Sequence, residues 1–187
     1  IFYNIEFKGI FYNIKTSWIG DIINNDSLSR FIIIDVTNDI TINYVKDGNC
    51  NNKDLIIHGN NHTINVISDK LGSGLAYLFT TYKNLLVDNV TINHEITYDN
   101  YIEERKCIFY KDKADGGRTI FNNIKYNGYA CFNKYYVSET EIGNIYINNC
   151  DFYSKSDFCI EYLYRGFTNF GICQDKVIIS NTSFNLD

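Results

Sequence analysis

The fold of this chain is decided by the stretch Leu85-Leu-Val-Asp-Asn89-Val-Thr-Ile92. Apolar residues alternate up to Val87, Asn89 follows, and a second alternation begins at Val90 with its parity reversed. Side chains of one straight strand point to opposite faces in turn, so Val87 and Val90 would face opposite ways. One residue in the left-handed conformation at Asn89 turns the chain and returns both halves to the same interior. Asparagine tolerates that conformation well, so the stretch predicts strand, corner, strand.

The same phrase recurs at 119–126, 145–152 and 177–184 and, with a corner two residues wider, at 55–66. Gly59 and two asparagines make the wider turn easy. Stacked copies could hydrogen-bond their corner amides from one layer to the next. The alternative is a set of unrelated strands followed by polar turns. The structural corner positions are Asn61, Asn89, Asn123, Asn149 and Asn181.

The composition fits one β-rich domain. A chain of 187 residues can bury a core, and 45% hydrophobic residues exclude a disordered chain. The 16 Tyr and 13 Phe, with many Ile and Asn, favour strands joined by Asn-rich turns. The chain has no Met and opens at Ile1 in mid-pattern, which predicts a processed fragment of a longer chain.

Charge and cysteine usage exclude several classes of function. A net charge of −5 with no basic run argues against nucleic acid as a partner. No apolar stretch approaches the roughly 20 residues of a membrane span, and no signal peptide is visible. No Cys-x-x-Cys occurs, which argues against a zinc ribbon or a thioredoxin-type site. Free buried thiols and one or two disulfides both stay open for Cys50, Cys107, Cys131, Cys150, Cys159 and Cys173.

The chain divides at residue 30. Residues 1–30 predict a pair of strands, or the tail of an earlier coil, up to Ile14, followed by a short helix or cap from Trp18 to Arg30. Residues 31–187 predict the repeating β-structure, which opens with strands at Phe31 to Val36 and Ile40 to Val45.

The string Ile56-Ile-His-Gly-Asn-Asn-His-Thr-Ile64 resembles the opening coil of the pectin-lyase-like right-handed parallel β-helix superfamily. More narrowly, it is similar to the Asn/Thr-rich surface adhesin-like proteins of that superfamily. The resemblance covers roughly Phe31 to Asp187 and implies an all-β, right-handed parallel β-helix with irregular loops. The superfamily includes lyases, hydrolases, phage tailspikes and non-enzymatic adhesins, so it does not decide the function.

The loops between the copies are the expected place of any chemistry. Glycoside hydrolysis needs two carboxylates about 5 to 9.5 Å apart. The polygalacturonase-type and pectate-lyase-type strings are missing, so a non-enzymatic module is favoured. If the chain is an enzyme, the catalytic candidates are the loop carboxylates Asp99, Glu103, Glu104, Asp112, Asp157 and Glu161.

Histidine spacing gives no metal site, because His58 and His62 flank a predicted turn and are expected to be polar corner residues. No cofactor is predicted, and a structural calcium ion among the loop carboxylates stays open.

We expect an extracellular or cell-surface module that binds a glycan or a surface protein. The alternatives are a polysaccharide lyase or hydrolase and a tailspike or fibre domain. Tyrosine suits binding sites because it combines apolar area with a polar tip. The binding candidates are Tyr98, Tyr101, Tyr135, Tyr136, Tyr162 and Tyr164.

Overall fold

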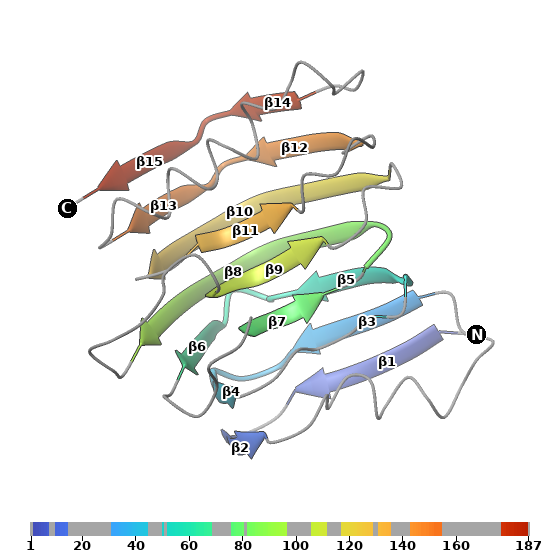
Figure 1. The fold of residues 1–187 in the computed structure, drawn as a ribbon, viewed down its shortest axis with the longest axis vertical. Coiled ribbons are helices and arrows are strands. Elements are labelled where there is room, and N and C mark those ends of the chain that lie inside the picture. The colour runs from blue at the N-terminus through green and yellow to red at the C-terminus, as the bar shows by residue number, and fades with distance from the viewer. Residues whose placement is uncertain are drawn as a thin grey trace.

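The computed structural model describes residues 2–7, 10–14, 31–44, 50, 52–68, 76–80, 82–96, 106–111, 117–128, 131–135, 143–154 and 177–186. Their regular elements are all β-strands and none is a helix, so this part of the protein is all-β, as the sequence predicts (Figure 1). In these residues no helix is long and apolar enough to span a membrane. The strands are β1 (Phe2–Phe7), β2 (Ile10–Ile14), β3 (Phe31–Val36), β4 (Ile40–Tyr44), β5 (Asp54–His58), β6 (Thr63–Ser68), β7 (Ala76–Thr80), β8 (Leu85–Ile96), β9 (Lys106–Lys111), β10 (Arg118–Gly128), β11 (Cys131–Tyr135), β12 (Asn144–Asn148), β13 (Asp151–Ser154), β14 (Val177–Ser180) and β15 (Ser183–Leu186).

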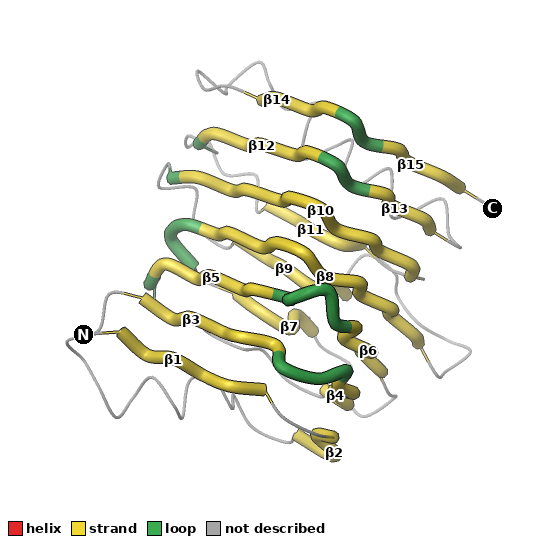
Figure 2. The backbone as a smooth tube through the Cα atoms, turned by 180° about the vertical axis from the view of Figure 1, so that it is seen from behind, coloured by secondary structure: helices red, strands yellow, loops and turns green. Residues whose placement is uncertain are grey.

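The described strands form three rows, and the pairs within each row are parallel. Row A contains β1, β3, β5, the first parts of β8 and β10, β12 and β14. Row B contains β2, β4, β6, the second parts of β8 and β10, β13 and β15. Row C, with β7, β9 and β11, forms a second layer facing β5, β8 and β10 (Figures 1 and 2).

The core lies between the rows. In row A, Ile32 and Ile34 are fully buried while Ile33 between them is only half-buried, as expected for one face turned inwards. Phe132 of row C has its ring centroid 5.0 Å from Phe121 of row A and 5.0 Å from Tyr126 of row B. The three rows therefore share one interior at this level.

Each corner asparagine named in the sequence has a positive φ: 63° at Asn61, 51° at Asn89, 54° at Asn123, 53° at Asn149 and 46° at Asn181. These values lie in the left-handed region. At Asn89 the turn lets β8 bury residues on both sides of the corner, with Val87 at 0% and Val90 at 3% exposure. Figure 2 shows the bends at which row A passes into row B.

Row C corrects the expectation that the segments between the copies of the phrase, such as residues 93–118 and 133–143, are loops. Strand β9 lies inside the first of these regions, and the end of β11 lies inside the second. The three consecutive residues Ile108, Phe109 and Tyr110 are all buried, so both faces of β9 are covered. A strand buried on both faces shows no alternation, and the alternating pattern of rows A and B could not reveal it.

The two ends of the chain can also be compared with the expectation. Ile179 sits at an inward-facing position of the phrase but is 45% exposed, because no described strand covers the free edge of β14. At the other end, β1 and β2 pair with β3 and β4 and so continue rows A and B. The helix or cap expected from Trp18 to Arg30 lies outside the described residues.

Candidate functional site

The outer face of row A carries an apolar column that runs across the strands. Its members alternate with the core residues and are register partners from one strand to the next. Five of them are half-buried, and Ile178 is exposed. The column consists of Ile33, Ile56, Leu86, Ile120, Tyr146 and Ile178. Apolar residues aligned on the outside of a parallel sheet are unusual, because such sheets are normally covered on both faces.

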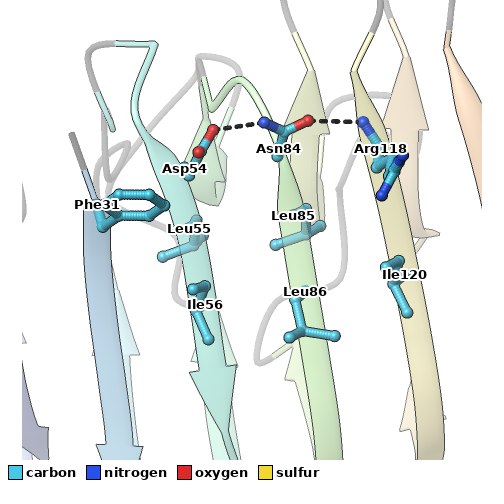
Figure 3. Close-up of a pocket in the computed structure, with 9 residues that line it drawn as sticks. All are labelled: Phe31, Asp54, Leu55, Ile56, Asn84, Leu85, Leu86, Arg118 and Ile120. Atoms are coloured by element: carbon cyan, nitrogen blue, oxygen red, sulfur yellow. Dashed lines mark hydrogen bonds between the residues drawn. The ribbon is translucent and has the colours of Figure 1, made fainter.

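A hollow of about 290 Å³ lies on this face, close to the 300–1,000 Å³ typical of ligand pockets (Figure 3). Asn84, which directly precedes β8, borders the hollow and hydrogen-bonds the first residues of β5 and β10. Asn84 donates its side-chain amide to Asp54 Oδ1 at 2.6 Å, and Arg118 N donates to Asn84 Oδ1 at 2.8 Å. These bonds fix which way the amide of Asn84 points. The lining residues are Phe31, Asp54, Leu55, Ile56, Asn84, Leu85, Leu86, Arg118 and Ile120.

A polar ladder runs beside the apolar column, two residues further along each strand. Within it, Asn148 Nδ2 donates to Asn122 Oδ1 at 3.0 Å, and Ser180 Oγ donates to Asn148 Oδ1 at 2.8 Å. The side chains thus support one another across strands in the way parallel ladders do. The ladder consists of Asp35, His58, Asp88, Asn122, Asn148 and Ser180.

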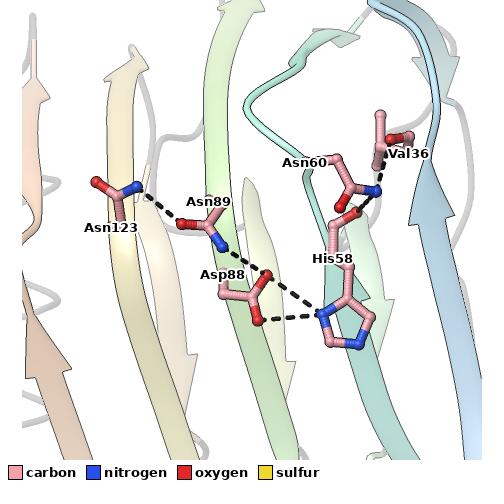
Figure 4. Close-up of polar contacts among 6 residues, drawn as sticks. All are labelled: Val36, His58, Asn60, Asp88, Asn89 and Asn123. Atoms are coloured by element: carbon pink, nitrogen blue, oxygen red, sulfur yellow. Dashed lines mark hydrogen bonds and ion pairs between the residues drawn. The ribbon is translucent and has the colours of Figure 1, made fainter.

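Within the ladder, Asp88 orients His58 (Figure 4). His58 Nδ1 lies 3.1 Å from Asp88 Oδ2 and 3.3 Å from Oδ1, so Nδ1 donates to the carboxylate. Asn89 Nδ2 donates to Asp88 Oδ1 at 3.3 Å, and Asn123 Nδ2 donates to Asn89 Oδ1 at 2.8 Å. With Nδ1 as donor, Nε2 of the neutral imidazole is a hydrogen-bond acceptor, on a side chain that is 37% exposed.

His58 and His62 turn away from each other. His58 contacts Asp88 on the following strand, whereas His62 Nδ1 lies 3.4 Å from Asp39 Oδ1, in the turn between β3 and β4. The two imidazoles therefore do not converge on one ion. Within the described ranges, no group of three or more His, Cys, Asp or Glu side chains could hold a metal.

Four of the corner asparagines line a second hollow, of about 230 Å³, on the outside of the bend between rows A and B. Thr91, Lys125 and Asp151 of row B complete its polar lining. The corner asparagines found here are Asn61, Asn89, Asn123 and Asn149.

Almost all residues that the sequence marked for catalysis or binding lie outside the described residues. The exception is Tyr135, the last residue of β11, of which only the backbone is described. The carboxylates outside are Asp99, Glu103, Glu104, Asp112, Asp157 and Glu161, and the tyrosines outside are Tyr98, Tyr101, Tyr136, Tyr162 and Tyr164.

The alternating pattern of the phrase predicts the residues that face the core and says nothing of the outer face of row A. A signal was present in the sequence. Ile33, Ile56, Leu86 and Ile120 each stand between two core residues and are themselves apolar, so the alternation is broken in the same place in each strand. Such a break predicts apolar side chains on both faces of a strand.

No protein-family model matches this chain, and comparisons with curated proteins and with solved structures give no match either.

Proposed function

We propose that this chain is a non-enzymatic, right-handed parallel β-helix module of an extracellular or cell-surface protein, and that it binds a glycan on the outer face of row A. The chain order of the rows supports the β-helix: β7 in row C leads into rows A and B in β8, β9 leads into both in β10, and β11 leads into β12 and β13. The resemblance of residues 56–64 to β-helix adhesins points the same way.

The observation that carries the binding function is the apolar column beside the polar ladder. Sugar rings have an apolar C–H face and a rim of hydroxyls, so they suit a surface that offers both in parallel. The oriented Nε2 of neutral His58 can accept a hydrogen bond from a sugar hydroxyl, and the amides of Asn122 and Asn148 can both donate and accept. Tyr146 adds an aromatic ring on the column. Because both features run across the strands, the ligand lies along the stack.

The described carboxylates of this face favour binding over hydrolysis. Asp54 and Asp88 are four register positions apart, about 13 Å at ~3.3 Å per residue, which exceeds the ~9.5 Å limit for glycosidase pairs. Asp35 and Asp88 lie on either side of His58 in the ladder, so the imidazole stands between the two carboxylates and contacts Asp88.

The test is binding to a panel of soluble polysaccharides, namely laminarin, xylan, dextran and polygalacturonate, by isothermal titration calorimetry. Tyr146→Ala and His58→Ala should each weaken binding by about tenfold, from lost ring contact and a lost hydrogen bond. Lys125→Ala, an exposed change on row B, is the matched control and should bind like the wild type. Affinity that neither row A variant changes would place the ligand elsewhere and contradict the proposal.

The enzymatic alternative makes a different prediction on the same panel. If the chain is a lyase or hydrolase, new reducing ends or unsaturated products accumulate, and changing one of the loop carboxylates, for example Asp99→Asn, abolishes them. If no polysaccharide binds, the face serves a protein partner instead, or the chain belongs to a trimeric tailspike or fibre, which the molecular mass in solution tests.

A further inference from the structure

Some of the corner asparagines begin the sequence Asn-x-Ser/Thr, in which the asparagine can accept an N-linked glycan in a eukaryotic secretory pathway. These sequons are Asn61-His-Thr63, Asn89-Val-Thr91 and Asn181-Thr-Ser183. We propose that Asn61 carries an N-linked glycan in the folded, secreted protein and that Asn89, in the neighbouring layer, does not. This proposal rests on the extracellular or cell-surface location proposed above, and it does not depend on the glycan-binding face.

Asn61 lies in the wide corner between β5 and β6, which is held together without its side chain. The residue is exposed, and within the described part of the chain its side-chain amide makes no hydrogen bond. Asn60 Nδ2 donates to Val36 O at 3.1 Å and anchors the corner to the preceding strand (Figure 4). His62 N donates to Gly59 O at 2.8 Å and closes the turn. A glycan on Nδ2 of Asn61 therefore breaks none of the hydrogen bonds that fix this corner.

Asn89 occupies the corresponding corner of the next layer, and both ends of its side-chain amide are engaged. Its Nδ2 donates to Asp88 Oδ1 at 3.3 Å, and its Oδ1 accepts from Asn123 Nδ2 at 2.8 Å. The residue is half-buried, and it borders the corner hollow together with Asn61 and Asn123. Neighbouring strands lie only about 4.7–4.9 Å apart. A sugar on Nδ2 of Asn89 has to fit between these layers and displaces the bonds of the amide, so the fold excludes a glycan there.

The glycan donor is an oligosaccharide that is linked to a lipid through pyrophosphate, and the secretory pathway supplies it. Nδ2 of Asn61 attacks the anomeric carbon of the first sugar, and the bond from that carbon to the pyrophosphate oxygen breaks. The lipid pyrophosphate leaves with the electron pair, and the amide nitrogen loses one of its two protons. No group is oxidised or reduced. Because transfer precedes folding, the fold decides which glycosylated chains reach the native state.

Peptide mapping of the secreted chain tests the proposal. The full chain is expressed behind a cleavable leader in a eukaryotic secretory host, and circular dichroism compares its fold with that of the chain made without glycans in bacteria. Trypsin, which cuts after Lys and Arg, releases the described sequons in the separate peptides 54–70, 84–105 and 177–187. Peptide-N-glycosidase then acts in heavy-oxygen water and converts each glycosylated asparagine into a labelled aspartate. The label should appear at Asn61 in peptide 54–70 and be absent from Asn89 in peptide 84–105.

The distribution of the label between secreted and retained chains sharpens the test. A secreted, folded chain that lacks the label at Asn61, or that carries it at Asn89, would overturn the proposal. Label at Asn89 that is confined to chains retained in the cells would support it, because those chains failed to fold. If the wild type is retained altogether, Thr91→Ala should restore secretion with a glycan at Asn61, and continued retention would count against the proposal.

Thr63 and Thr91 offer a matched pair of variants, because they are register partners at the same place after the corner. Thr63→Ala removes the sequon of Asn61 and should lower the mass of the secreted chain by one N-glycan. Thr91→Ala removes the sequon of Asn89 and should leave the glycan mass unchanged. An unchanged glycan mass in Thr63→Ala would contradict the proposal, and Asn61→Asp gives the same readout if Thr63→Ala fails to fold. The polysaccharide titrations use the chain without N-glycans, so the two proposals can fail independently.

Discussion

The corner asparagine Asn123 stabilises the fold in two ways. Its backbone adopts the left-handed conformation, which costs most other residues about 1 kcal/mol or more. At Asn123, where φ is 54°, the side chain also donates to Asn89 Oδ1 at 2.8 Å. Glycine can replace only the backbone contribution, whereas alanine can replace neither the backbone conformation nor the hydrogen bond. The two contributions can therefore be separated by substitution.

We predict that Asn123→Ala lowers the free energy of unfolding by about 2 kcal/mol, from about 1 kcal/mol of backbone strain and about 1 kcal/mol for the lost hydrogen bond. Asn123→Gly should cost about 1 kcal/mol, because glycine adopts positive φ without strain. Urea denaturation monitored by circular dichroism measures both. Equal losses in the two variants would show that the left-handed conformation is not what the asparagine supplies.

Two glycines differ in what a methyl group would meet. A Cβ at Gly59 would lie 2.4 Å from Asn89 O and 2.3 Å from Val90 Cβ, in the corner of the next strand. A Cβ at Gly128 would lie 2.2 Å from Tyr126 Oη, whose phenol lies 3.3 Å from His94 Nδ1. Gly59 thus allows close approach of two backbones, whereas Gly128 leaves room for one side chain.

We predict that Gly59→Ala destabilises the protein by about 3 kcal/mol or more, because part of what it meets is backbone. Gly128→Ala should cost less, about 1–2 kcal/mol, since a phenol can move. A second change, Tyr126→Leu, should reduce the penalty of Gly128→Ala in a double-mutant cycle and leave that of Gly59→Ala unchanged. Denaturant midpoints measure the stability of the three single variants and of the two double variants that contain Tyr126→Leu. A smaller loss for Gly59→Ala than for Gly128→Ala would contradict the distinction.

At the scale of elements, the paired strands β12 and β14 of row A differ in how far their inward-facing residues are buried. Ile147 of β12 is register partner of Ile179 of β14, yet the first is 1% exposed and the second 45%. The residue type is the same, so among the described elements the neighbouring strand distinguishes the two positions. A strand on each side covers Ile147, while β14 is at the edge of the described sheet.

Ile147→Ala should therefore destabilise the protein by about 2–5 kcal/mol, the usual cost of emptying a core position. Ile179→Ala should change stability by less than ~1 kcal/mol. Thermal unfolding of the two variants side by side provides the comparison. A large loss at Ile179 would mean that another part of the protein covers it in solution.

How far the sequence predicts an element depends on which faces the element buries. The strands of rows A and B can be predicted from the sequence, because their inward-facing residues are apolar on both sides of an asparagine, as in β8 and β10. Row C does not, because β9 buries residues on both faces and looks like any short apolar run. The polar ladder could not be predicted from the sequence either. His58 and Asp88 are 30 residues apart, and only the register of β5 with β8 makes them neighbours.

For the molecule as a whole, contacts far apart in the sequence decide how it folds. Pairs such as Asn93 and Asn127, or Asn148 and Ser180, are 34 and 32 residues apart yet hydrogen-bond directly. Each new strand pair requires a loop of this length to close before the contact contributes. Parallel pairing offers no short hairpin that could form first.

We predict slow refolding, on the order of seconds or longer, since topologies dominated by non-local pairs fold slowly. Stopped-flow dilution from urea, followed by tyrosine fluorescence and circular dichroism, measures the rate. Single-phase recovery within about a millisecond would show that local structure, rather than strand register, limits folding.

The wide corner at Gly59-Asn60-Asn61-His62 shows that a corner can become longer without changing the register of the strands beside it. Although it is two residues longer than the corner at Asn89, Leu55 still pairs with Leu85 before it and Thr63 with Thr91 after it. A bond from His62 N to Gly59 O at 2.8 Å closes the turn, and both central asparagines are exposed. Insertions at this point are thereby absorbed outside the stack. The corner is a natural grafting position, where a foreign peptide can be displayed while the strands on either side keep their partners.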